Sequence, residues 1–267
     1  MEENKKYRLT DETIEVEGKT LYRIEALKDF CEIKKGDKGG FIESENNLAH
    51  EGDAWVSGDA CVYDNARVSG NAHVYGEAWV YGSACVYGDA CAFGCACVYD
   101  NAWVSGNGQV YGNARVYGSA HLYGNARVYG STHLCGNACV YDNACVYDNA
   151  CVSGNACVYG DALVFDNACV YGNAHLFANV RLYGYTCVCG DAEISNKSDY
   201  IVFKNWWSSG RYFTWTRSNN MWSVGCFYGT GEELIKKAYK DSELSGRQYE
   251  RLVKYVEETL KDEENGE

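Results

Sequence analysis

The sequence predicts a mainly β protein: a left-handed parallel β-helix of about eight triangular coils, with an N-terminal β cap and a C-terminal α+β module. One hexapeptide repeats 24 times between residues 52 and 195 without an insertion or deletion. Its small and aliphatic positions lie two residues apart, so both face the same side of a short strand. The two positions before the small residue are rich in Gly, Asn and Asp, which accept turn conformations. Each hexad is therefore one strand and one corner, and three hexads close a coil of 18 residues.

Two columns of apolar residues are expected to fill the interior of this prism. The aliphatic position runs from Val56 to Ile194 and the small position from Ala54 to Ala192, and the residue between them points outward. At roughly 4.8 Å between stacked strands, the prism would be about 35–40 Å long. An antiparallel sandwich would need variable loops, so the unbroken register favours a solenoid.

The segment 1–51 precedes the regular repeat and reads as an N-terminal hairpin and cap. Its two predicted strands flank a turn at Gly18. Ile42 and Leu48 fall in register with the small positions of the repeat, so an irregular coil is predicted to begin near Gly40. A cap is expected because a bare solenoid end exposes apolar side chains and unpaired backbone groups.

After the repeat of residues 52–195, residues 196–267 form a third unit of a different kind. Three aromatic-rich strands and two helices are predicted in it. The strands are expected at 199–207, 211–218 and 221–228, and the helices at 231–240 and 246–262. Ser245 is the expected N-cap of the second helix, whose apolar stripe includes Tyr249, Val253 and Val256.

Charge and hydropathy narrow the classes of partner. The net charge is −13, which disfavours direct binding to nucleic acid or to an anionic membrane. No apolar run approaches the length of a membrane span, and the charged N-terminal segment has no signal-like apolar core. We therefore expect a protein that stays in the compartment where it is made, without membrane contact.

The opening of the chain resembles a known group of proteins. The segments that carry the resemblance are residues 6–9, 22–30, 35–45 and 47–56. Together with the repeat, over residues 1 to about 195, they are similar to hexapeptide-repeat left-handed β-helix proteins of bacteria and prophages. Members of that family are mostly uncharacterised, and some are labelled acyltransferases. The resemblance implies the fold and a phage or prophage setting, and hence the cytoplasm of a bacterial host as the location.

The cysteines and histidines raise the question of a metal site. Most of the 15 cysteines lie in the repeat, and none forms a Cys-x-x-Cys pair. His121, Cys139, Cys157 and His175 are predicted to stack on one face, one per coil. Zinc needs ligands that converge on one point, and a straight column does not supply them. We expect no metal, no cofactor and free thiols.

Acyl transfer is the enzymatic alternative. Many hexapeptide-repeat proteins are trimeric acyltransferases whose sites use a histidine and a loop thrown out of the coil. The histidines of the repeat are His73, His121, His133 and His175, all at the outward position, and no loop interrupts the repeat. These histidines are equally explained as surface residues, so catalytic residues are not assigned.

The outer surface suggests association instead. The position after the aliphatic residue holds Tyr 14 times and Phe three times, which predicts ladders of rings along the corners. Trp55, Trp79 and Trp103 are predicted to point outward and to spiral around the prism, one on each face. Exposed aromatic residues with few charges mark association surfaces, so we expect a homo-oligomer or a partner on one face.

The C-terminal unit carries the candidate binding residues. Aromatic and basic side chains crowd together there, and such pairs stack on planar ligands such as nucleotides or form hot spots for proteins. The candidate residues are Trp206, Trp207, Arg211, Trp215, Arg217 and Trp222. The alternative is that these aromatic residues only build the core of a small module.

These observations favour a non-enzymatic solenoid that binds or scaffolds. Its partner would be a host protein or a small ligand, including a nucleotide, and interference with a host defence is one form of this hypothesis. The alternatives are a trimeric hexapeptide-repeat acyltransferase and a structural protein associated with the virion.

Overall fold

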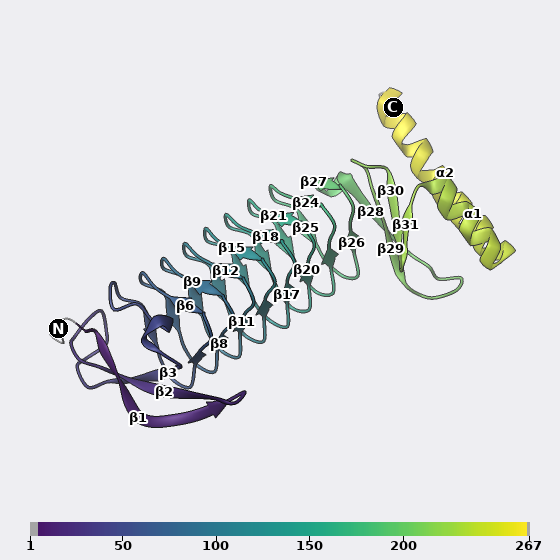
Figure 1. Ribbon diagram of the computed structural model, residues 1–267. Coiled ribbons are helices and arrows are strands. Elements are labelled where there is room, and N and C mark those ends of the chain that lie inside the picture. The colour runs from purple at the N-terminus through teal and green to yellow at the C-terminus, as the bar shows by residue number, and fades with distance from the viewer. Residues whose placement is uncertain (1–4, 266–267) are drawn as a thin grey trace.

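A computed structural model describes residues 5–265 of the chain. Its body is a long three-sided prism that runs from an N-terminal hairpin to a C-terminal pair of helices (Figure 1). Each hexad contributes a strand of two residues, the outward residue and the aliphatic residue after it. Each strand pairs in parallel with its counterpart one coil away, as Cys97–Val98 does with Arg115–Val116. The predicted parallel β-helix is confirmed, and its left-handed winding stays a prediction.

The prism has three faces, which we name by their last strands. The β26 face is an 11-stranded sheet of β1 (Tyr7–Val16), β2 (Lys19–Ala26), β3 (Lys38–Ile42), β5 (Cys61–Val62), β8 (Trp79–Val80), β11 (Cys97–Val98), β14 (Arg115–Val116), β17 (His133–Leu134), β20 (Cys151–Val152), β23 (Cys169–Val170) and β26 (Cys187–Val188). The β25 face contains β4 (Trp55–Val56), β7 (His73–Val74), β10 (Cys91–Ala92), β13 (Gln109–Val110), β16 (Arg127–Val128), β19 (Cys145–Val146), β22 (Leu163–Val164) and β25 (Arg181–Leu182). The β27 face contains β6 (Arg67–Val68), β9 (Cys85–Val86), β12 (Trp103–Val104), β15 (His121–Leu122), β18 (Cys139–Val140), β21 (Cys157–Val158), β24 (His175–Leu176) and β27 (Glu193–Ile194).

An irregular coil precedes the eight regular ones. Strand β3 pairs in parallel with β5, and Leu48 forms a bridge to Val68. The short 3₁₀ helix η1 (Glu45–Asn47) makes the corner between these two pairings. The predicted start of this coil near Gly40 is confirmed, and so is the hairpin of β1 and β2 around Gly18. The predicted register is wrong: Ile42 and Leu48 align with the aliphatic residues Val62 and Val68 and not with the small positions, because two extra residues lie between Leu48 and Val56.

The interior consists of the two predicted columns. Ala54 and Val56 in the first coil, and Ala192 and Ile194 in the last, are fully buried, as are their counterparts between. Where Thr132 replaces alanine, its hydroxyl donates to the Tyr129 carbonyl at 2.6 Å, so the buried polar group is satisfied. The narrow interior therefore accepts little change in side-chain volume.

The corners explain the preference for Gly, Asn and Asp. The residue after the ring-bearing position adopts positive φ, and at Gly52 (φ 70°) an added Cβ would collide with the Gly70 carbonyl of the next coil. The next residue forms a second ladder: the Asn107 side-chain amide donates to the Asn125 side-chain oxygen at 2.8 Å, and Asn125 donates to Asn143 at 3.1 Å. Asn and Asp thus serve both the turn and the coil-to-coil contact.

Aromatic ladders follow the corners as predicted. The corner after the β25 face carries seven consecutive stacked rings, from Tyr75 through Tyr129 to Tyr183. Successive rings in its first part are nearly parallel, with centroids 4.8 Å apart for Tyr75 and Phe93. This stacking covers the corner and stiffens it.

Lys6 replaces hydrogen-bond donors that a preceding coil would supply. Within the prism, each small residue accepts an N–H from the coil before it, as the Ala72 carbonyl does from Trp55. At the first coil, the buried Lys6 ammonium donates to the Ala54 carbonyl at 2.7 Å and to the Gly52 carbonyl at 3.2 Å. Burial lowers the pKa of Lys6 to about 8.

Asn47 does the same at another corner. Its side-chain amide donates to the Asp64 carbonyl at 3.1 Å and to the Ala66 carbonyl at 3.0 Å, which are the equivalent positions two hexads later. Its side-chain oxygen accepts the Ser44 N–H at 2.8 Å. Asn47 is fully buried, so these bonds form out of water.

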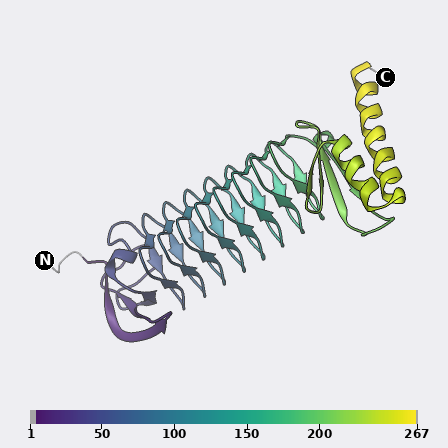
Figure 2. The same ribbon diagram turned by 45° about the vertical axis from the view of Figure 1, so that its right-hand side comes forward.

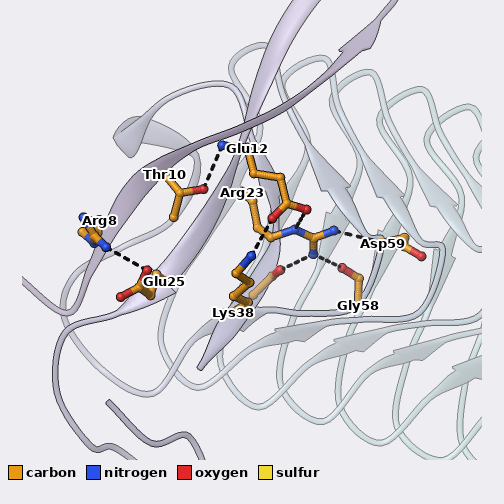
Figure 3. Close-up of polar contacts among 9 residues, drawn as sticks. Arg8, Thr10, Glu12, Arg23, Glu25, Lys38, Gly58 and Asp59 are labelled. Atoms are coloured by element: carbon orange, nitrogen blue, oxygen red, sulfur yellow. Dashed lines mark hydrogen bonds and ion pairs between the residues drawn. The ribbon is translucent and has the colours of Figure 1, made fainter. Parts of the chain in front are cut away.

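Arg23 of β2 covers the remaining corner (Figure 3). Its Nη1 donates to the Gly58 carbonyl at 3.3 Å and to the Gly39 carbonyl at 2.9 Å. Glu12 accepts from Arg23 Nε at 2.6 Å and from Lys38 at 2.8 Å, which fixes the guanidinium in place. The three corners of the first coil are thus each capped by one side chain.

The cap also buries Trp55, which was expected to be exposed on the outer surface. Trp55 points away from the prism axis but is 1% exposed, because Tyr7 and Phe30 pack against it. Tyr63 is likewise buried beneath the hairpin. Trp103, 45% exposed, is the member of the predicted Trp spiral that keeps a large open surface. The repeat cannot indicate this burial, because it depends on the hairpin folding back over the first coils.

The C-terminal unit is a four-stranded antiparallel sheet with two helices (Figure 2). After the 3₁₀ helix η2 (Lys197–Asp199), the sheet contains β28 (Tyr200–Lys204), β29 (Tyr212–Thr216), β30 (Met221–Val224) and β31 (Phe227–Gly229). The helices are α1 (Gly231–Asp241) and α2 (Glu243–Asn265). The predicted third strand is therefore two strands, because Gly225 at φ 59° turns the chain between them.

The second helix begins earlier than expected. It starts at Glu243, so Ser245 lies in its first turn and is not the N-cap. The Ser242 hydroxyl accepts the Ser245 N–H at 3.1 Å instead. The predicted apolar stripe is confirmed, since Tyr249 and Val253 are buried in the core of the unit. No helix within residues 5–265 combines the length and apolarity needed to cross a bilayer.

Candidate functional site

Two of the six candidate residues belong to the hydrophobic core of the C-terminal unit. Trp215 of β29 and Trp222 of β30 lie opposite each other in the sheet and are each 1% exposed. The Trp215 indole N–H donates to the Asn220 side-chain oxygen at 2.9 Å. Trp207 is half-buried and meets Tyr249 edge-on, with ring centroids 5.0 Å apart. These indoles stabilise the unit and leave little surface for a partner.

The other three candidates are more accessible, but only Arg211 lines a hollow. Arg217 forms an ion pair with Glu263 of α2, which holds the last helix against the sheet. Trp206 is 72% exposed on the loop after β28. Arg211 is exposed just before β29 and lines two adjoining hollows. The structure therefore does not bring the six predicted residues together into one site.

Three hollows meet around Tyr212: two lie between the last coils and the C-terminal sheet, and one lies within the C-terminal unit. The first, about 300 Å³, lies between Tyr183, Tyr185, Tyr200 and Tyr212. The second, about 540 Å³, extends from Tyr185 and Tyr212 over the end of the β26 face. The third, about 270 Å³, runs along the C-terminal sheet beside Arg211. Together they form a groove at the junction, which we call the junction groove.

Exposed tyrosines form one wall of the junction groove. Tyr183 is the last ring of the seven-ring ladder and is 56% exposed. Tyr185 is 60% exposed and stacks on Tyr212, with centroids 5.5 Å apart and planes within 10°. Lys204 lies 5.5 Å from the centre of the Tyr212 ring. The groove thus offers open ring faces beside a cation.

The backbone at this corner is open. One coil earlier, the Phe165 N–H donates to the Leu182 carbonyl at 3.0 Å and the Asn167 N–H to the Gly184 carbonyl at 2.9 Å. The equivalent N–H groups of the last coil are those of Tyr183 and Tyr185. Neither donates to an acceptor within residues 5–265. An added Cβ at Gly184 (φ 68°) would meet nothing within 4 Å.

The other two corners of the last coil are covered. At Gly190, an added Cβ would collide with the Tyr228 side chain. At Ser195, the backbone N–H donates to the Asp199 carboxylate at 2.7 Å. Two outward positions are also satisfied, since Thr214 accepts the Cys187 N–H at 3.1 Å and Ser218 accepts the Glu193 N–H at 2.7 Å. The corner at Gly184 is therefore the corner of the last coil at which no side chain lies over the backbone.

The charge of the junction groove differs from that of the whole protein. The charged side chains that line its three hollows, within the described part of the chain, are Arg211 and Lys237, both positive. The protein as a whole carries −13. A basic patch in an acidic protein attracts acidic partners while the remaining surface repels them.

The histidines and cysteines of the repeat form columns and no cluster. His121, Cys139, Cys157 and His175 stack on successive strands of the β27 face, as predicted. Across residues 5–265, no three potential ligands converge on one point. The 15 thiols are free. His73 and His133 lie on the other two faces, so the four histidines of the repeat do not meet in one chain.

A larger hollow, about 650 Å³, lies at the opposite end of the molecule beside Lys6 and His50. The buried Lys6 ammonium, which lines this hollow, already donates to two backbone carbonyls of the first coil. His50 stacks on Tyr7 with ring centroids 4.4 Å apart. These groups complete the cap, so we assign this hollow to the structure of the cap.

Sequence reasoning missed Tyr183, Tyr185, Tyr200 and Tyr212 as groove residues. One signal was present: Tyr185 occupies a position that is Asn or Asp in 18 of the 24 hexads. This bulky ring at a corner, two residues after the last ring of the ladder, departs from the repeat for a local reason. The contact with Tyr212 supplies that reason, but nothing in the repeat indicates which residue lies opposite.

Comparison with known families gives one match. The YdcK β-solenoid repeat matches residues 60–76, 108–124 and 120–136, all within the regular coils. The match supports the β-solenoid repeat and carries no activity, partner or phage setting. Comparison with curated proteins finds no match to this sequence.

Proposed function

We propose that this β-solenoid repeat protein is a non-catalytic scaffold that binds an acidic, extended segment of a partner protein in the junction groove. The observation that carries the proposal is the open corner at Gly184, where two backbone N–H groups lie beside exposed tyrosines. A prophage setting and a host partner belong to the same proposal, and they rest on the resemblance of the N-terminal segment.

Backbone pairing is the first contribution to binding. The end of a parallel β stack is a template for a further segment, because its unpaired N–H groups need acceptors. Carbonyls of a bound segment can take the places that the Leu182 and Gly184 carbonyls occupy one coil earlier. Such pairing gives affinity without sequence preference, so the side chains around the corner supply the preference.

Ring faces and charge are the second contribution. Tyr183 and Tyr185 expose more than half of their surface, and tyrosine and arginine are among the side chains enriched at binding hot spots. Arg211 and Lys237 favour carboxylates over ammonium groups. The bound segment is therefore acidic, with an aromatic or aliphatic residue against the rings.

The prism itself acts as a rigid support. Its repeat surface presents nearly the same residues in every coil, so it discriminates poorly between partners. The junction groove is the place where the repeat meets a unit of different sequence. A rigid element that holds one specific site at its end suits a scaffold or a blocking protein.

Fluorescence anisotropy with two labelled peptides tests this function. One peptide alternates Glu and Phe, and its counterpart alternates Lys and Phe. We expect the acidic peptide to bind saturably with a Kd below about 100 μM and the basic peptide not to bind. Tyr185→Ala and Arg211→Glu should each weaken binding about tenfold or more. Tyr129→Ala, in the middle of the same ladder, should leave the Kd unchanged.

Three outcomes would contradict the proposal. They are equal binding of both peptides, an unchanged Kd in Tyr185→Ala, and absence of binding at millimolar peptide. Melting curves of the three variants show whether each remains folded.

A further inference from the structure

The aromatic ladder at the corner after the β27 face is interrupted at Ser105. On one side of this residue, the coils from Tyr123 to Phe177 carry consecutive stacked rings, with centroids between 4.8 and 5.4 Å apart. On the other side, the same position of the preceding coil is Tyr87. Tyr87 and Tyr123 are therefore two coils apart, or roughly 9.6 Å, which is twice the ordinary spacing of the ladder.

The rings next to this interruption are open. Tyr87 is 37% exposed and Tyr123 is 38% exposed, whereas the rings within the ladder are half-buried. Trp103 of β12, two residues before Ser105, is 45% exposed and meets Tyr87 edge-on, with ring centroids 6.2 Å apart. On its other side, Trp103 stacks on His121 with centroids 5.4 Å apart. A ring placed at Ser105 would thus lie between two tyrosines and beside an indole.

A neighbouring corner shows what such a ring looks like in place. Trp79 of β8 meets Tyr63 edge-on with centroids 6.2 Å apart, and Tyr81 stacks on Tyr63 at 5.1 Å with planes 4° apart. Trp103 and Tyr87 repeat the geometry of Trp79 and Tyr63 at the same centroid distance. The indole therefore leaves the ladder position free, and the ring that Tyr81 supplies at one corner is missing at the other.

The N-terminal cap gives a second precedent. The triplet Trp-Val-Ser occurs twice in the chain, at Trp55–Ser57 and at Trp103–Ser105. At the first triplet, Tyr7 and Phe30 of the cap pack against the indole, with centroids 6.3 and 5.3 Å away, and bury it. At the second triplet, the rings that reach the indole within residues 5–265 come from the repeat itself. This triplet therefore lacks the aromatic partner that covers the first.

Two hydrogen-bond acceptors lie at the edge of the interruption. The amide ladder of this corner runs from Asn71 to Asp89 at 2.9 Å and starts again from Asn107 to Asn125 at 2.8 Å. An aspartate has no N–H to donate, so the ladder breaks between Asp89 and Asn107, each two residues after the ring position of its coil. The Asn107 side-chain oxygen accepts no hydrogen bond within residues 5–265. This edge suits a ring that carries N–H donors and no negative charge.

We propose that the interruption at Ser105 is a binding site for a planar, amino-substituted heteroaromatic ligand, uncharged or cationic, whose ring inserts between Tyr87 and Tyr123 beside Trp103. The ring restores the ladder, and its amino group donates to the acceptors at the edge. Stacking on aromatic side chains holds such rings in many proteins, because every heteroaromatic base has a π-face. The site lies on β9, β12 and β15, outside the junction groove, so it does not depend on the proposed function.

Titration of the full chain with adenosine, an uncharged amino-purine, followed by saturation-transfer NMR tests this site. We expect saturable binding with a Kd of roughly 1 mM or below. Purine riboside, which lacks the amino group, should bind about threefold more weakly or worse. Ser105→Tyr fills the interruption with a ring of the chain and should weaken adenosine binding about tenfold or more. Ser153→Tyr, the same change at a ladder position of another corner, should leave the Kd unchanged.

A second pair of variants tests the indole. Trp103→Ala should weaken adenosine binding about tenfold, whereas Trp206→Ala, which removes an exposed indole of the C-terminal unit, should not change it. Melting curves show whether each variant remains folded. If Ser105→Tyr does not fold, the two tryptophan variants give the same decision.

Four outcomes would overturn the proposal. They are the absence of binding at about 10 mM adenosine, equal affinity of the wild type and Ser105→Tyr, equal affinity of the wild type and Trp103→Ala, and equal binding of the two nucleosides. Sedimentation adds one more check. A dimer that Ser105→Tyr dissociates would show that a second copy of the chain covers the interruption, and the ligand proposal would then be wrong.

Discussion

The two ends of the prism expose opposite backbone groups, and the chain covers them to different extents. The first regular coil presents carbonyls, and Lys6, Arg23 and Asn47 each donate to the carbonyl at one corner. The last coil presents N–H groups, and the corner at Gly184 is left open between exposed tyrosines. Side chains of the chain itself therefore satisfy the carbonyls at one end, whereas N–H groups at the other end have no acceptor within residues 5–265.

The two ends also differ in how the segment that covers them is joined to the prism. At the N-terminal end, the hairpin folds back on the coils and joins the same sheet, so cap and prism share one core. At the C-terminal end, the last unit has its own sheet and its own core. A separate unit contacts the prism over part of its end, and the junction groove is what remains between them.

The largest expected effect separates the core of the C-terminal unit from its surface. Trp215→Ala should cost about 3–5 kcal/mol of the unfolding free energy of this unit, because a fully buried indole leaves a cavity. Trp206→Ala, on the exposed loop, should stay within about 0.5 kcal/mol. Urea denaturation followed by near-UV circular dichroism measures both. Equal effects of the two changes would show that the assignment of core and surface is wrong.

The second-largest expected effect tests whether the N-terminal cap stabilises the prism. Asn47→Ala leaves the Asp64 and Ala66 carbonyls without donors, and should destabilise the protein by about 2–4 kcal/mol. The control is Asn137→Ala, which removes an exposed amide ladder in the middle of the prism and should cost less than about 1 kcal/mol. If both variants unfold at the same urea concentration, the cap does not contribute as described.

A smaller effect is expected in the middle of the prism, which serves as a reference for both ends. Ala126→Leu inserts methyl groups into a fully buried column and should cost about 1–3 kcal/mol through overpacking. Arg127→Ala, one residue later on the outer face, should change stability by less than about 0.5 kcal/mol. Thermal melting distinguishes the two, and a tolerated leucine would mean that the interior is wider than the alanine column indicates.

The prism could be predicted from the sequence because every hexad repeats the same pattern of small, aliphatic and turn residues. The features outside the repeat were harder to predict from the sequence. The burial of Trp55 depends on the hairpin, and the burial of Trp215 and Trp222 depends on α1 and α2 packing over the sheet. Tyr185 has its stacking partner, Tyr212, more than 20 positions away, without a period that links the two residues.

Amide hydrogen exchange at the Gly184 corner shows directly whether the end of the prism is open there. The Tyr183 and Tyr185 amides should exchange at least about 100-fold faster than the Phe165 and Asn167 amides one coil earlier, because only the latter pair has carbonyl acceptors within residues 5–265. Binding of the acidic peptide should slow the exchange of Tyr183 and Tyr185. Equal protection of the two pairs in the free protein would contradict the account, since the end of the prism would then be closed on all sides.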